Sequence, residues 1–240
     1  MRSVKAVFKK QVKDLLKNMA ILIQFIIFPV VAFVMTELVA GADDFGMPDT
    51  MFVTMFASIF VGMSLIPSIA GIIAEDRERK SLRFLIMAGV KPSAYLLGVG
   101  GVIFIVSFFP SLAFSWMGGF SGEEFWIFMS VLMSSVIAST LLGATIGIIS
   151  KNQQMATGLS TSIALILGFT PMLALFDERI GRIINIFYTQ QFNVIVDSFY
   201  SITGYQSEAG FGESFLIIWA NIAVFAVLFG LAYKKKGLKG

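Results

Sequence analysis

Six long apolar segments, separated by short polar or charged stretches, constrain this chain more than any other feature. A membrane-spanning helix needs about 20 predominantly apolar residues, and each segment is long enough. Hydrophobic residues make up 57% of the 240 residues and charged residues 14%, whereas a typical soluble domain carries about 25% charged residues. The sequence therefore predicts an all-α polytopic membrane protein with a single transmembrane domain over residues 1–240. The predicted spans are residues 19–40, 51–74, 93–117, 125–150, 155–176 and 214–233.

Lysine and arginine residues gather on one side of this six-span arrangement. Of the 18 in the chain, six lie in residues 1–18, five in residues 75–92, one at Lys151 and four after residue 233. An excess of Lys and Arg marks cytoplasmic loops, so both termini are predicted to be cytoplasmic. The first apolar segment is longer than the core of a secretory signal peptide, about 7–15 residues, and is interpreted as a retained span.

Residues 1–18 combine apolar positions at helical spacing with lysines on the remaining faces. This pattern predicts a basic amphipathic helix that lies along the inner headgroup layer with its apolar face down. Two roles fit: an anchor that only sets orientation, or a connecting helix that transmits force from a cytoplasmic partner to the first span. The apolar positions are Val4, Phe8, Val12, Leu15 and Leu16, and the residues assigned to the connecting helix are Lys5, Phe8, Lys9, Val12, Lys13 and Leu16.

The stretch after the second predicted span is the most informative part of the chain. Residues 75–80 are all charged and mixed in sign, and an apolar stretch follows them. Glu75 and Arg79 are i,i+4 neighbours, which favours a short surface helix. Mixed charges suit a protein partner better than an anionic lipid surface, which favours uniformly basic residues. The alternative is an ordinary loop that only sets orientation.

Two apolar patches, residues 180–188 and 194–200, lie in the predicted outer connection between the fifth and sixth spans, separated by the polar residues 189–191. Each patch is too short to span a membrane. They are therefore predicted to be interfacial or re-entrant helices, whose backbone must be satisfied by protein or by a water-filled cavity.

The spans carry little chemistry of their own. The chain has no His, no Cys and no G-x-x-x-x-G-K-[ST] motif, so it cannot bind ATP through a P-loop. Ion-coupled transporters use ionisable groups inside the membrane, and only Glu37 lies near a span. We expect no enzyme activity, no cofactor or metal, and no nucleic-acid partner. Mildly polar span residues serve either helix packing or a weakly polar path for an amphipathic cargo; the candidates for the path are Gln24, Ser58, Thr157, Ser160 and Thr161.

Over essentially its whole length the chain resembles the permease subunit of ABC exporters of the type-2 class. Six spans with cytoplasmic termini follow a basic connecting helix, and a long outer connection precedes the last span. The loop after the second span is similar to the family pattern of an acidic-basic run, then Gly-Thr-Leu, an apolar turn and Pro-Val. Lys80 and Ser81 stand here at the Gly and Thr positions, and Gly89 at the Pro position.

The resemblance implies that this loop is a coupling helix, which docks into a cleft of a cytoplasmic ATP-binding subunit. It also implies two permease halves, either copies of this chain or sister chains, with ATP and magnesium in two partner ATPases. The expected setting is a bacterial cytoplasmic membrane, and the expected function is export of a hydrophobic or amphipathic cargo such as a peptide, antibiotic or lipid. A stand-alone channel or carrier, and a non-transporting assembly or sensor subunit, remain alternatives. The implied interface comprises Glu75, Asp76, Arg77, Glu78 and Arg79 as polar contacts with Ser81, and Leu82 and Leu85 packing beneath.

Overall fold

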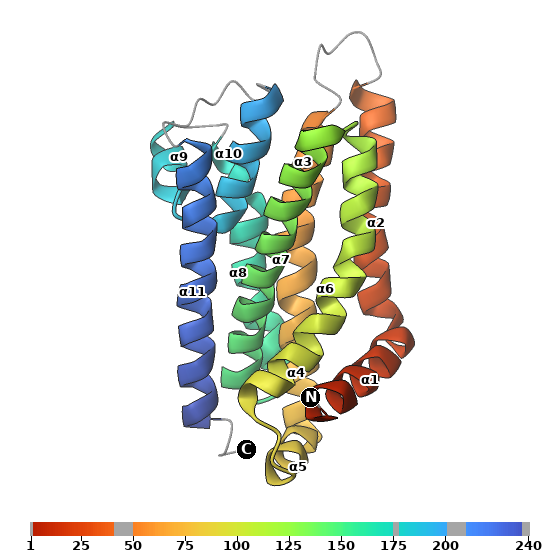
Figure 1. Cartoon of the computed structure of the whole chain (residues 1–240), viewed down its shortest axis with the longest axis vertical. Helices are drawn as coiled ribbons and strands as arrows, with labels where there is room; N and C mark the ends of the chain where they lie inside the picture. Colours follow the sequence, from red (N-terminus) through yellow and green to blue (C-terminus); the bar gives the residue numbers. More distant parts are fainter. Residues whose placement is uncertain (1, 41–49, 175–177, 201–209, 237–240) are drawn as a thin grey trace.

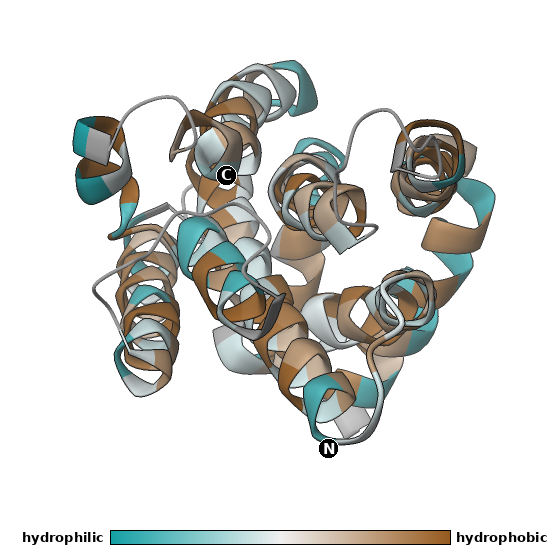
Figure 2. Cartoon of the chain, turned by 90° about the horizontal axis from the view of Figure 1, so that it is seen from above, coloured by the Kyte–Doolittle hydropathy of each residue, from teal (hydrophilic) through white to brown (hydrophobic). Residues whose placement is uncertain are grey.

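The long helices of the chain stand side by side in one bundle. The computed structural model describes residues 2–40, 50–174, 178–200 and 210–236, and the regular secondary structure of these residues is helical (Figure 1). Hydrophobic residues make up much of each long helix (Figure 2). The predicted six-span, all-α membrane fold is confirmed, because six helices among the described residues are long and apolar enough to cross a bilayer: Met19–Val39, Thr50–Glu78, Ser93–Met117, Gly122–Ile149, Gln153–Ala174 and Phe211–Lys235.

The second span contains a π-helical segment that the sequence did not reveal. In a π segment the hydrogen bonds run from residue i to i+5, and such segments frequently occur at functional sites. The hydroxyl of Ser139 donates to the carbonyl of Val61 inside this segment at 2.8 Å. In chain order the first two spans and their leader are α1 (Arg2–Lys17), α2 (Met19–Met35), η1 (Thr36–Ala40, π), α3 (Thr50–Ile59), η2 (Phe60–Leu65, π) and α4 (Ile66–Glu78).

The remaining helices complete the bundle around the second span. That span is 78% buried over its most apolar stretch, against 17% for the last span. Small residues allow close contact with it, since a Cβ at Gly143 would lie 2.7 Å from the Ile66 carbonyl oxygen. These helices are α5 (Ser81–Met87), α6 (Pro92–Met117), α7 (Gly122–Ile149), α8 (Gln153–Ala174), α9 (Glu178–Ile184), α10 (Tyr188–Tyr200) and α11 (Phe211–Lys236).

The connection between the last two spans holds two helices, but they divide elsewhere than predicted. Residues 189–191, which the sequence suggested as the separator, lie inside α10 and are buried. The break falls at residues 185–187 instead. Their polar groups are only partly satisfied among the described residues: the Gln191 amide donates to the Asn185 carbonyl, but the Thr189 hydroxyl and the Gln190 and Gln191 side-chain oxygens are buried without a partner. Next to them, the hydroxyls of Tyr188 and Ser139 lie 2.7 Å apart. That these helices enter the bilayer remains a prediction.

The two ends of the bundle differ in character. α1, α5 and the last turn of α11 lie at one end, and α9 and α10 lie toward the other (Figure 1). We call the first the basic end, because it carries the lysines of α1 and the lysines 234–236 at the end of α11.

Candidate functional site

The charged run after the second span continues α4 rather than forming a separate surface helix. α4 extends through Glu78, and the chain then turns at Arg79 and Lys80 before α5 begins at Ser81. Lys80 has a positive φ of 60°, a conformation in which Cβ is strained and which glycine adopts without cost. The type-2 pattern has Gly at this position, and the backbone turn supplies a physical reason for it.

Asp76 lies buried near the end of α4, with 6% of its surface exposed. The Lys10 ammonium of α1 donates to one carboxylate oxygen at 2.5 Å, and the Tyr95 hydroxyl of α6 donates to the other at 2.9 Å. Asp14 lies 3.3 Å from the same ammonium. Partial burial opposes the charge on Lys10, but the hydrogen bond and charge of Asp76, helped by Asp14, outweigh it and raise the pKa of Lys10. Asp76 therefore joins α4 to both α1 and α6.

The next two residues hold the turn between α7 and α8. Arg77 donates to the carbonyl of Ile148 and, at 2.5 Å, to the carbonyl of Ser150, at the end of α7. The carboxylate of Glu78 accepts from the backbone N–H of Gln153 at 3.1 Å, at the start of α8. A cation at a helix C-terminus and an anion at a helix N-terminus are both favourable placements. These two side chains are therefore engaged within the chain.

The last three residues of the charged run, Glu78, Arg79 and Lys80, are exposed, and Glu75 at its start is half-buried. Glu75 and Arg79 form an ion pair at 2.7 Å, but Arg79 is largely exposed. Such surface pairs contribute about 0–1 kcal/mol. Lys80 is also exposed and has no ion pair with a residue that the structure describes.

α5 has one anchored face and one exposed face. Leu82 is buried, Leu85 packs against the core, and Ser81 is half-buried. Phe84 and Met87, in contrast, are 64% and 65% exposed. Sequence reasoning did not single out these two residues, although both lie in the apolar stretch that follows the charges.

α1 packs on the bundle instead of resting its apolar face on the membrane surface alone. Its most buried line is Val7, Gln11 and Leu15, against α6. A Cβ at Gly98 of α6 would lie 2.5 Å from Val7, so the glycine admits this close crossing. Of the residues assigned to the connecting helix, the apolar Phe8 and Val12 are half-buried and Leu16 is exposed. The lysines Lys5, Lys9 and Lys13 are exposed.

The five candidates for a cargo path do not form one cluster. Gln24 accepts a hydrogen bond from Ser68 at 2.9 Å, and Ser58 is buried. Thr157 and Thr161 lie exposed on α8, whereas Ser160 is buried and donates to the Thr157 carbonyl at 3.1 Å. Gln24, Ser58 and Ser160 are therefore buried or half-buried within the bundle, whereas Thr157 and Thr161 lie on the exposed face of α8.

The geometry defines a multi-pass membrane protein with a helical junction at its basic end. The family model of the ABC-2 type transporter matches residues 2–175. The chain therefore belongs to the ABC-2 type transporter family, as the resemblance indicated, and is a permease component that works in a membrane with an ATP-binding subunit. No curated protein sequence matches the chain significantly.

Proposed function

We propose that this chain is the transmembrane subunit of an ATP-driven exporter, powered by a separate subunit that binds ATP and magnesium. The chain itself carries no P-loop motif, so the energy comes from the partner. The basic end faces the cytoplasm of a bacterial cell, because Lys and Arg excess marks cytoplasmic loops. α9 and α10 then lie on the outer side, where they enter the outer leaflet as re-entrant helices.

The exposed face of α5 carries this proposal. Large apolar side chains exposed in a water-facing region mark interaction sites, and Phe84 and Met87 are both about two-thirds exposed. Arg79 and Lys80 flank them with positive charge. Aromatic residues, Met and Arg are the types enriched at the centres of protein interfaces. The ATP-binding subunit docks on this face.

Hydrogen bonds at the end of α4, next to α5, can transmit a movement of the ATP-binding subunit to the spans. Asp76 links the end of α4 to α1 and α6, and Arg77 and Glu78 link it to α7 and α8. A displacement of α5 that moves the end of α4 therefore acts on four other helices through the hydrogen bonds of α4. This is how closure of the ATPases opens the permease toward the outside.

The second permease half, a copy of this chain or a sister chain, lies against the exposed polar face of α8. Thr157 and Thr161 belong to this face. Small hydroxyl residues are enriched where membrane helices approach each other, and lipid is a poor neighbour for them. Cargo crosses between the halves, and the scarcity of charge in the spans suits a hydrophobic or amphipathic molecule such as a peptide, antibiotic or lipid.

Reconstitution tests the proposal directly. The chain is placed in liposomes with the ATP-binding protein encoded beside it, and ATP-dependent movement of a labelled amphipathic peptide or lipid is followed. We expect transport only with both proteins and ATP, and its loss in Met87→Asp. The control is Ser121→Asp, an exposed residue in the turn between α6 and α7 at the opposite end. Transport by the chain alone without ATP would instead indicate a stand-alone channel or carrier.

A further inference from the structure

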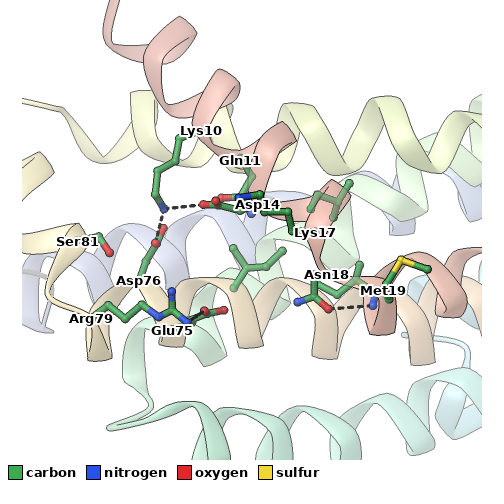
Figure 3. Close-up of a pocket in the computed structure, with 13 residues that line it drawn as sticks. Lys10, Gln11, Asp14, Lys17, Asn18, Met19, Glu75, Asp76, Arg79 and Ser81 are labelled. Atoms are coloured by element: carbon green, nitrogen blue, oxygen red, sulfur yellow. Dashed lines mark hydrogen bonds and ion pairs between the residues drawn. The ribbon is translucent and has the colours of Figure 1, made fainter.

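A cavity of about 500 Å³ lies between α1, the start of α2 and the last turns of α4 (Figure 3). This is within the range of ligand pockets, about 300–1,000 Å³. We propose that it binds the headgroup of a phospholipid that carries both a phosphate and an ammonium, such as phosphatidylethanolamine, from the leaflet at the basic end. The inference rests on the membrane setting of the chain and does not need the docking of an ATPase.

Gln11 is the first sign that the cavity has an occupant. Its side chain lines the cavity (Figure 3), is 2% exposed, and makes no hydrogen bond with a residue that the structure describes. A buried amide without a partner is costly, and buried polar side chains are normally hydrogen-bonded. A polar ligand in the cavity supplies the missing partner.

One side of the cavity suits a phosphate. Asn18 and Met19, at the N-terminus of α2, line it. The first amides of a helix have no partner inside the helix, and the helix dipole is positive there, so a helix start attracts phosphate. The Asn18 side chain already accepts from the Ile21 amide at 3.3 Å, which leaves the amides of Met19 and Ala20 for the phosphate. Lys17 also lines the cavity and has no ion pair with a described residue.

The other charges in the cavity favour a zwitterion over a simple anion. Asp14 lines it 3.3 Å from the Lys10 ammonium (Figure 3), and Glu75 lies on the α4 side, paired with Arg79. Three cations face three carboxylates, so a free multivalent anion finds no excess of positive charge. An ammonium next to the phosphate pairs with Asp14, the carboxylate with the longest ion-pair distance (3.3 Å) and a half-exposed side chain. The six charged lining residues are Lys10, Lys17, Arg79, Asp14, Glu75 and Asp76.

The walls of the cavity favour a lipid over a protein segment. Leu15, Ile21 and Ile72 supply apolar lining, and Met19 is exposed beside them. The next turn of α2 continues this surface with Ile23, which is also exposed, so acyl chains have an apolar path from the cavity.

Native mass spectrometry of the purified full chain tests the proposal, with phosphatidylethanolamine titrated into the detergent. We expect the wild type to retain the lipid and Lys17→Glu to bind it roughly tenfold more weakly, through loss of a charge-assisted contact. The matched control is Lys13→Glu, an exposed lysine of the same helix outside the cavity, which binds like the wild type. A wild type that retains no lipid, or equal loss in both variants, overturns the proposal.

Further binding experiments identify the ligand. Asp14→Asn is expected to reduce the preference for phosphatidylethanolamine over phosphatidylglycerol, because it removes a partner of the ammonium. An unchanged preference would contradict a zwitterionic ligand. Inorganic phosphate is expected not to displace the lipid, and displacement would identify a site for free phosphate. Gln11→Cys, a single cysteine in this chain, is expected to cross-link no protein subunit. A cross-link to the ATP-binding subunit would make the cavity a docking site and overturn the lipid.

Discussion

The last turn of α4 and the helix α5 are neighbours in the chain, yet they use their side chains in opposite ways. Asp76, Arg77 and Glu78 are charged and bond to α1, α6, α7 and α8. Phe84 and Met87 are apolar and exposed. The charged residues thus fix the end of α4, from which α5 continues, to the neighbouring helices. The exposed apolar residues of α5 form the surface available for a partner. A run of charge after a membrane span does not by itself mark the residues that touch a partner.

Removal of Asp76 is expected to have the largest effect, because it breaks the support. Asp76→Ala leaves the Lys10 ammonium and the Tyr95 hydroxyl without their shared partner, and breaking a buried ion pair costs about 3–5 kcal/mol. Because Lys10 is partly exposed, we expect about 3 kcal/mol at most. Thermal unfolding in detergent measures the loss. The control is Asp14→Ala, which removes the exposed partner of Lys10 and should change the unfolding temperature little. Equal unfolding temperatures for the two variants would contradict a stabilising role of Asp76.

Truncation of the exposed face is expected to leave the fold intact and to weaken binding of the ATP-binding subunit. Phe84→Ala removes a large exposed ring, and central interface anchors contribute about 2 kcal/mol or more, roughly a 30-fold change in affinity. Titration of the ATPase onto the permease in nanodiscs measures it. Met19→Ala, a similarly exposed apolar residue (64%) on α2, is the control. Wild-type affinity in Phe84→Ala would remove α5 from the interface.

A substitution at Glu78 tests whether this residue stabilises the start of α8. Glu78→Gln keeps the shape but removes the negative charge at a helix N-terminus, and such a loss costs about 0.5–1 kcal/mol. Glu75→Gln breaks only the surface pair with Arg79 and should cost less than about 0.5 kcal/mol. Thermal unfolding of the two variants side by side distinguishes them. The reverse order of stability would show that Glu78 does not hold the α7–α8 turn.

Replacement of Lys80 by glycine is expected to have the smallest effect, and it should stabilise the fold rather than destabilise it. Lys80→Gly relieves a left-handed backbone that costs a non-glycine residue about 1 kcal/mol, partly offset by the greater freedom of glycine in the unfolded chain. We expect a gain of about 0.5 kcal/mol. Lys91→Gly is the control, because Lys91 has a φ of −70° and gains nothing from glycine. Destabilisation by Lys80→Gly would contradict the strained turn.

The sequence predicted what depends on local pattern and missed what depends on distant partners. Hydropathy alone located the six spans. The helical extension of α4 beyond residue 74 was not predicted, because its charges find partners 66 to 75 residues away, at Lys10 and Gln153. Gln11 was also missed, since a polar residue on an amphipathic helix gives no local sign that it is buried. The π segment at Phe60–Leu65 likewise has no local signature.

Cysteine labelling of the exposed face of α5 tests the central claim most directly. The chain has no cysteine, so Met87→Cys reports one position, and Ser121→Cys, exposed in the turn between α6 and α7, reports the opposite end. We predict that a membrane-impermeant maleimide labels Met87→Cys only in inverted vesicles and that the bound ATP-binding subunit blocks this labelling. Ser121→Cys should be labelled in intact cells, whether or not the ATPase is present. Labelling of Met87→Cys in intact cells, or equal labelling with and without the ATPase, would contradict coupling through α5.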